Sequence, residues 1–252
     1  MSAFFESLSL WQMLAGLAML CASGMLRGFT GYGFAIAAVP LLSLIMPPTS
    51  AVPIVLILQL FIGNNNLKET VRLADWRAIK ILVAAAAVVT PLGLLLLTRL
   101  PQDIARLCIA AIVVGTVIML ASKHRHANGA PRTWVTLCYG ALSGLTNGLG
   151  GMPGPSIIAY FLASDTPKER ARASMIMVFT LTSVCALIPL LIADAVRLEM
   201  AVLALVALPL VWLSTSLGRR LFLITTDAIY RRAGLVILSA TALMLVLRVI
   251  YV

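Results

Sequence analysis

RGFTGYGF, at residues 27–34, interrupts an otherwise apolar run of the sequence with three glycines. A second interruption, NGLGGMPG at residues 147–154, stands 120 positions later and combines glycines with a proline. Glycine and proline both weaken a helix, so each stretch predicts a break between two helical segments. Backbone that is released from a helix cannot face lipid, so a break within membrane-spanning sequence must be enclosed by protein or line a cavity.

The composition predicts a helical protein that crosses a membrane several times. Apolar residues make up 61% of the 252 residues, charged residues only 11%, and the mean hydropathy is +1.04. A soluble domain is nearer half apolar and a quarter charged. The alternating pattern of barrel strands is absent, which disfavours an outer-membrane barrel. The net charge of +10 lies in short loops, where lysine and arginine set membrane orientation, so we expect no nucleic-acid partner.

Both halves of the chain carry the same order of five segments, which predicts a duplicated unit. The segments are 8–26, 34–46, 50–63, 77–98 and 104–122, then 133–146, 156–163, 173–193, 198–217 and 228–250. Matching prolines recur in order, Pro47 with Pro167 and Pro91 with Pro209, at offsets that drift from 120 to 118. We therefore predict an N-terminal repeat at 1–122, a cytoplasmic linker at 123–132 and a C-terminal repeat at 133–252, together forming one membrane domain.

The predicted fold is an all-α polytopic membrane protein with two inverted-topology repeats. Five segments per repeat is an odd number, so the second repeat enters the membrane from the opposite side. The count stays odd whether the broken pair that starts each repeat is re-entrant or fully spanning. Fourteen lysines and arginines fall in one set of loops and four in the other. The positive-inside rule assigns the larger set to the cytoplasm and both termini to the outside.

The two breaks predict an anion site near the bilayer midplane, where inverted repeats bring their broken segments together. A helix N-terminus carries roughly half a positive charge and free N–H groups. The short helices after Gly33 and Pro153 would therefore form a nest of donors suited to an oxyanion. All nine carboxylates fall in loops or at helix ends, so we expect an anionic substrate, no metal and no cofactor.

The predicted substrate site draws on both breaks. Its members are Arg27, Gly28, Phe29, Thr30, Gly31, Tyr32, Gly33, Asn147, Gly148, Gly150, Gly151, Met152, Pro153 and Gly154. The glycines let the backbone approach the ligand, and Thr30 and Asn147 are candidate side-chain donors. Arg27 either pairs with the anion or extends to the lipid headgroups, and the sequence leaves both roles open.

Other side chains have two open roles as well. Phe29 and Tyr32 either line or gate the site, or they pack between helices. Polar residues on the third segment of each half either face the pathway or bond to neighbouring helices, and they are Gln59, Asn64, Thr180 and Ser183.

The paired signatures GFTGYG (28–33) and GLTNGLGGMPGP (144–155) resemble the TauE/SafE family of sulfite exporters, as does PKERARA (167–173). The resemblance covers essentially the whole chain. It implies a multi-pass carrier of the bacterial inner membrane for small sulfur-containing anions, either sulfite or an organosulfonate such as sulfoacetate. In that membrane, the outside orientation expected for both termini makes them periplasmic. The two halves differ at one position, because Arg27 precedes the first break and Asn147 the second.

The leading interpretation is a secondary transporter that moves this anion by alternating access between the two sides of the lipid bilayer. No GxxxxGK[ST] motif occurs, so we do not expect ATP to drive it. An anion channel, or a carrier for another small organic anion, is the alternative. An enzyme is not expected, because HExxH and GxSxG are absent and His124 and His126 both lie in a polar loop. Export or import, the coupling ion and the oligomeric state stay open.

Overall fold

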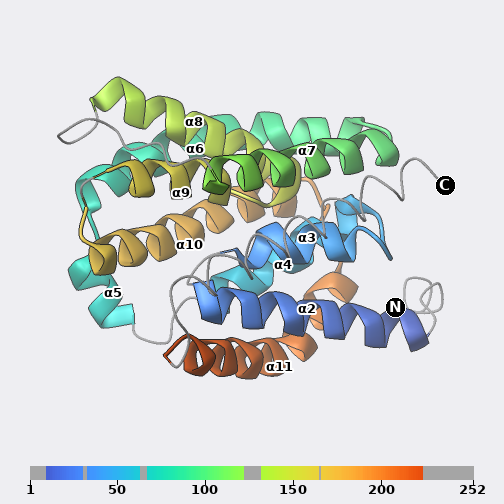
Figure 1. The fold of residues 1–252 in the computed structure, drawn as a ribbon. Helices are drawn as coiled ribbons and strands as arrows, with labels where there is room; N and C mark the ends of the chain where they lie inside the picture. Colours follow the sequence, from blue (N-terminus) through green and yellow to red (C-terminus); the bar gives the residue numbers. More distant parts are fainter. Residues whose placement is uncertain (1–9, 31–32, 63–66, 122–131, 165, 224–252) are drawn as a thin grey trace.

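The computed structural model describes residues 10–30, 33–62, 67–121, 132–164 and 166–223, and this part of the chain contains helices without strands. The helices are α2 (Leu10–Thr30), α3 (Phe34–Leu42), α4 (Pro48–Ile62), α5 (Leu67–Leu73), α6 (Trp76–Arg99), α7 (Gln102–Ala121), α8 (Thr133–Gly150), α9 (Gly154–Ala163), α10 (Lys168–Ile192) and α11 (Leu198–Leu223). Figure 1 shows α6, α7 and α8 on one side, α2 and α11 on the other, and α3, α4 and α10 between them.

Both predicted breaks are present, but each is shorter than the sequence predicted. Helix α2 continues to Thr30 and α8 continues to Gly150, so the first half of each glycine-rich stretch is helical. The next helices begin at Phe34 and Gly154, which are 120 positions apart. The helix ends that precede them, Thr30 and Gly150, are also 120 positions apart. Gly151 ends α8 at φ 62°, and a glycine adopts this left-handed backbone without the clash that a Cβ would cause.

Tight packing explains why glycine-rich sequence stays helical here. The two most extensive helix–helix interfaces of the described chain join α2 to α11 and α8 to α6 (Figure 1). A Cβ on Gly28 would fall on the carbonyl of Thr215, and a Cβ on Gly148 would fall on the carbonyl of Thr90. We call these two interfaces the glycine seams. Such close backbone approach is the usual way in which small residues hold membrane helices together, and here it outweighs the low helix propensity of glycine.

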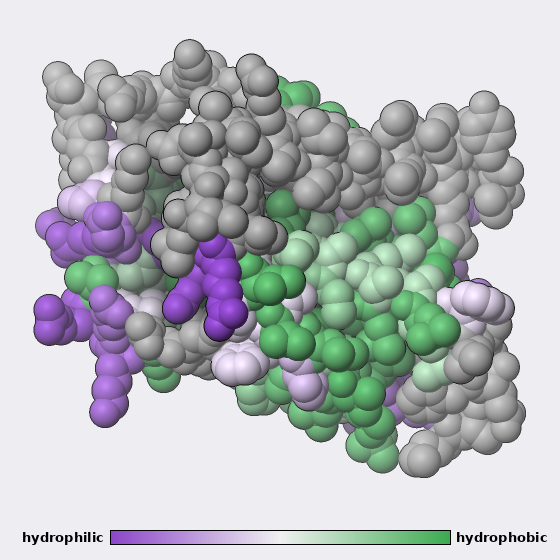
Figure 2. Space-filling model, turned by 60° about the horizontal axis from the view of Figure 1, so that its bottom comes forward, coloured by the Kyte–Doolittle hydropathy of each residue, from purple (hydrophilic) through white to green (hydrophobic). Residues whose placement is uncertain are grey.

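The centre of the protein is formed by the short helices of the first break. In α3 every residue except Leu41 is buried, and most of α4 is buried as well. Residues 67–73, which lie between the predicted segments 50–63 and 77–98, form the additional helix α5, which turns by 89° from α4 and buries none of its residues. Figure 2 shows hydrophilic residues gathered at the end of the molecule where α5 lies in Figure 1.

The outward helix faces are suited to lipid. Among the described residues, three helices are long and apolar enough to cross a membrane, namely Trp76–Arg99, Glu169–Ile192 and Leu198–Arg220, and α4 with α5 would make a fourth if the bent pair is one span. Val88, Val206 and Ile192 are between 64% and 80% exposed, and Figure 2 shows a broad apolar region. Exposed apolar surface of this kind indicates contact with a membrane. The predicted last segment, 228–250, and residues 123–131 of the predicted linker lie outside the described residues.

The glycine seams generate a stability prediction. Gly144→Val in α8 would push a side chain into the backbone of Ala86 in α6. We expect a loss of about 2 kcal/mol or more, seen as an apparent melting temperature in detergent that falls by about 4–8 °C. Gly115→Val in α7 is the matched control, because no other described helix comes within 4 Å of its added Cβ. Equal losses in both variants would show that the seam contact is not the cause.

Candidate functional site

A small pocket, with a cavity volume of about 10 Å³, lies where the two breaks meet. Its wall contains Arg27 of α2, Gly33 immediately before α3, Gln59 of α4, and Pro153 and Gly154 at the start of α9. The structure therefore brings together five of the residues that were predicted from sequence, four from the substrate site and one from the pathway. They come from both halves of the chain.

The N-termini of two helices lie at this pocket. Gly33 is the N-cap of α3 and Pro153 is the N-cap of α9, and neither supplies a side-chain hydrogen bond to the first turn of its helix. The first N–H groups of a helix have no partner within it and carry its partial positive charge. Pro155 lacks an N–H, so the start of α3 offers more backbone donors than the start of α9.

The Arg27 side chain adds a full positive charge at the same place. Arg27 is only 4% exposed, and in the described part of the chain its guanidinium has neither a carboxylate partner nor a hydrogen-bond acceptor. Arg172 in α10, which is also positive, is the charged residue of the described chain that acts on Arg27. A buried charge without a partner is costly. A cation and two helix N-termini around one cavity can together bind an anion.

Arg106 in α7 shows how this chain otherwise treats a buried arginine. Its side chain is almost as buried as that of Arg27, but both sides of its guanidinium are engaged. Nε donates to the carbonyl oxygen of Ser43 at 3.2 Å, and Nη1 donates to Oδ1 of Asp103 at 3.0 Å. The contrast identifies Arg27 as a group that the described protein leaves uncompensated.

Gln59 forms the wall of the pocket that faces α10. Its Nε2 donates to Oγ of Ser183 at 2.9 Å and to the carbonyl oxygen of Phe179 at 3.4 Å. These bonds join α4 to α10 beside the pocket, so Ser183 acts on the pocket through Gln59 and does not line it. Thr180 bonds to the carbonyl oxygen of Ile176 in its own helix and lies outside the pocket wall.

The remaining predicted site residues lie around the pocket. Asn147 is fully buried in α8, where Nδ2 donates to the carbonyl oxygen of Thr182 at 2.8 Å. Met152 is fully buried in the core, and a Cβ on Gly150 would contact its methyl group. Gly28 and Gly148 belong to the glycine seams, and Gly151 to the break itself. Outside the described residues lie Gly31, Tyr32 and Asn64, together with the side chains of Phe29 and Thr30.

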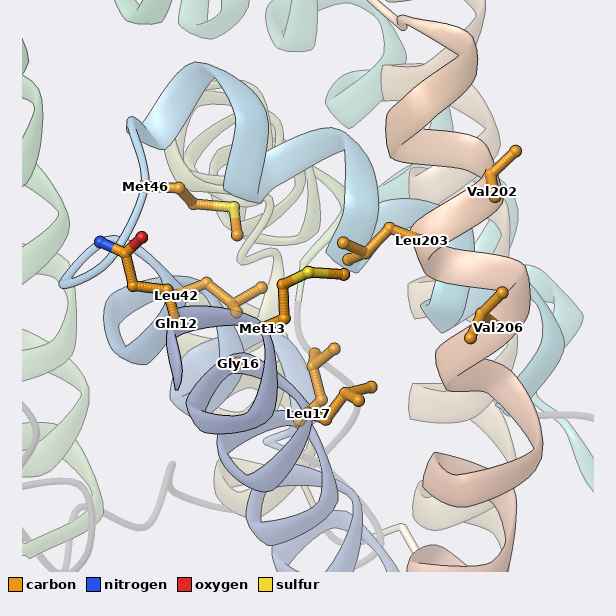
Figure 3. Close-up of a pocket in the computed structure, with 10 residues that line it drawn as sticks. Gln12, Met13, Gly16, Leu17, Leu42, Met46, Val202, Leu203 and Val206 are labelled. Carbon is orange, nitrogen blue, oxygen red and sulfur yellow. The ribbon is translucent and has the colours of Figure 1, made fainter. Parts of the chain in front are cut away.

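A larger pocket, with a cavity volume of about 140 Å³, lies between α2, α3 and α11 (Figure 3). Met13, Leu17 and Leu203 face this space, and no charged side chain lines it. Its apolar wall offers an anion neither a cation nor a helix N-terminus. Size therefore does not decide which pocket could hold an anion.

Comparison with known proteins gives a family for this arrangement. A family model described as "Sulfite exporter TauE/SafE" matches residues 15–245. The chain belongs to the TauE/SafE family. A curated relative from Cupriavidus necator, named "Probable sulfite/organosulfonate exporter TauE", is 30% identical over 155 residues. The match covers 58% of each chain, so it spans less than two thirds of that relative. No solved structure matches the chain.

Three pocket residues of this TauE/SafE family member were not predicted from its sequence. Ala35 and Ile36 line the pocket from the first turn of α3, and Phe179 lines it from α10. All three are apolar and look like ordinary core residues in the sequence. The repeat offset was the one signal for Phe179, because it stands 120 positions after Gln59.

The two buried arginines should respond in opposite ways to substitution. Arg27→Met removes an uncompensated charge, so we expect the ligand-free protein to gain about 1–2 kcal/mol, a rise of a few degrees in apparent melting temperature. Arg106→Met leaves the buried carbonyl of Ser43 without its side-chain donor and removes the ion pair to the exposed Asp103, so we expect a fall. Differential scanning fluorimetry in detergent without added anions measures both. A fall for Arg27→Met as large as that for Arg106→Met would mean that Arg27 is paired.

Proposed function

We propose that this protein is a secondary transporter that carries a small sulfur-containing anion, sulfite or an organosulfonate such as sulfoacetate, across the bacterial inner membrane. The observation that carries the proposal is the buried guanidinium of Arg27, which has no partner among the described residues, in a pocket bounded by the N-termini of α3 and α9. A tetrahedral oxyanion would receive donors from all three directions. Family membership and the name of the Cupriavidus necator relative support sulfite or an organosulfonate as the class of anion.

We further propose that the two halves form inverted repeats around the pocket. Helix α2 packs on α11 as α8 packs on α6, and α4 contacts α11 as α10 contacts α6. An exchange of the two halves would interchange these pairs, which supports a pseudo-twofold relation. Gln59 bonds to the carbonyl of Phe179, its counterpart 120 positions later. A residue in contact with its own counterpart lies near such an axis, so the axis would pass beside the pocket.

The contacts in the glycine seams favour a different alignment of α6 with α11 from the one that the prolines suggested in the sequence. Gly28 meets the carbonyl of Thr215, and Gly148 meets that of Thr90. Both threonines also donate to the carbonyl four residues earlier, each at 2.7 Å. These contacts relate α6 to α11 by 125 positions, about two helical turns away from the pairing of Pro91 with Pro209. We therefore prefer Thr90 and Thr215 as counterparts.

Inverted repeats provide a physical route to alternating access. When two similar halves exchange conformations, a central site opens first to one side and then to the other. The pocket is small and its wall comes from both halves of the chain, which supports a carrier in which helices must move for the anion to bind and leave. A channel would instead need a continuous path, and it remains the competing outcome of the transport test.

The proposed site predicts selective, Arg27-dependent anion binding. We expect one member of a panel of sulfite, sulfate, thiosulfate, taurine, sulfoacetate and isethionate to raise the melting temperature of the purified protein. Arg27→Gln should abolish that rise, and Gly151→Val should weaken it, because φ 62° strains a β-branched residue beside the break. In proteoliposomes, saturable uptake with counter-exchange is expected. Unchanged binding by folded Arg27→Gln would place the anion elsewhere, and uptake without counter-exchange would favour a channel.

The inverted arrangement predicts which loops face the cytoplasm. In a background without the native cysteines, Lys68→Cys and Arg219→Cys should react with a membrane-impermeant maleimide only after the cells are opened. Gln102→Cys and Arg197→Cys should react in intact cells. Lys68, Gln102 and Arg197 lie at or near the start of a helix, and Arg219 lies near the end of α11. All four residues are exposed. Labelling of Lys68→Cys in intact cells would reverse the orientation, and agreement between positions 102 and 219 would contradict the inverted topology.

A further inference from the structure

The hydrogen bonds around Gln59 fix the direction of its side-chain amide. Ser183 Oγ donates to the carbonyl oxygen of Phe179 at 2.8 Å, so its single proton is already used. Towards Gln59 it can only accept, and it lies 2.9 Å from the amide nitrogen. The carbonyl of Phe179, at 3.4 Å from the same nitrogen, can also only accept. Two acceptors on this side require Nε2 to point towards α10.

The other end of the amide, the Oε1 atom of Gln59, is therefore an acceptor on the pocket side. Gln59 lines the pocket, and its Oε1 has no hydrogen-bond partner in the described part of the chain. Among the described residues, the side-chain oxygens that have neither solvent contact nor a hydrogen-bond partner belong to Ser43, Asn147 and Ser156. Oε1 of Gln59 is not one of them, so it retains some access to solvent. The pocket wall thus combines the cationic donor of Arg27 with a neutral acceptor.

We propose that this pocket selects anions that also carry a hydroxyl group, and that Gln59 Oε1 accepts the hydroxyl proton. This inference rests on the proposed function of the same pocket. The oxyanion would face Arg27 and the helix N-termini, and the hydroxyl would face Gln59. An anion without a donor would leave Oε1 unpaired or set it against another oxygen, and an unpaired buried acceptor weakens binding.

The charges around the pocket favour a hydroxyl group over an ammonium group as the donor. No carboxylate lines the pocket, and both helix N-termini carry partial positive charge. Arg172 adds a further positive charge to the surroundings of Arg27. A second cation on the ligand would meet repulsion from each of these groups, whereas a neutral hydroxyl would not. Short hydroxyalkyl sulfonates, and oxyanions that keep one proton, form the chemical class that fits.

A matched pair of ligands tests this proposal. Isethionate and 1-propanesulfonate have the same charge and nearly the same size, and they differ by a hydroxyl in place of a methyl group. We expect the full-length protein in nanodiscs to bind isethionate about tenfold more tightly in calorimetry. In Gln59→Met, a substitution of similar length, that ratio should fall to about one through weaker isethionate binding.

Two further variants keep the test informative if Gln59→Met folds poorly. Ser183→Ala leaves Oε1 in place but removes the nearer of the two acceptors that orient the amide, so the preference for isethionate should shrink. Thr116→Val is the control, because its buried hydroxyl bonds only to the carbonyl of Ile112 in α7, and it should keep the preference.

Each outcome has a distinct meaning. Equal affinity of the wild-type protein for the two ligands would overturn the role of Oε1 while leaving the anion site intact. Equal weakening of both ligands by Gln59→Met would mean that Gln59 donates to the oxyanion, which also overturns the proposal. Binding of neither ligand, nor of any other anion, by the wild-type protein would remove the proposed function itself.

Discussion

The burial of one guanidinium without a counter-charge is the constraint on which the site depends. Arg27 has lost nearly all contact with solvent, yet no acidic side chain in the described chain approaches it. The helix N-termini at the pocket add to its positive potential. Arg106 shows that the fold can satisfy a buried arginine when the role is structural. The unfavourable electrostatics at Arg27 therefore belong to the pocket and would be relieved by an anion there.

The glycine seams hold this arrangement together. Gly28, next to Arg27 in the sequence, is fixed against the backbone of α11, so the helix that carries the guanidinium has a defined position. Gly148, one residue after Asn147, holds α8 against α6 in the same way. Each break then starts only a few residues beyond a seam. In each glycine-rich stretch, the residues that pack two helix backbones together are thus followed directly by the break that borders the pocket.

Much of this could be predicted from sequence, because helix breaks in apolar sequence leave a strong signal. The helix starts at Phe34 and Gly154, and the meeting of Arg27, Gly33 and Gly154 at one pocket, followed from glycine, proline and the repeat offset. The extent of the breaks did not, because seam packing keeps Gly28 and Gly148 helical, and propensity contains no information about a neighbouring helix. Ile36 and Phe179 were missed for a related reason, since an apolar side chain gives the same signal in a core as in a pocket wall.

The first turn of α3 has a consequence for how large a ligand this cavity can admit. The Ile36 side chain occupies the space above Gly154, where a Cβ would lie 2.7 Å from its Cδ1 atom. The helix backbones already touch at the seams and leave no space between them, so the room in this pocket is set by side chains such as Ile36 and Phe179. Engineering towards bulkier anions would begin by trimming these two apolar side chains, because that leaves the charge of Arg27 and the side-chain amide of Gln59 in place.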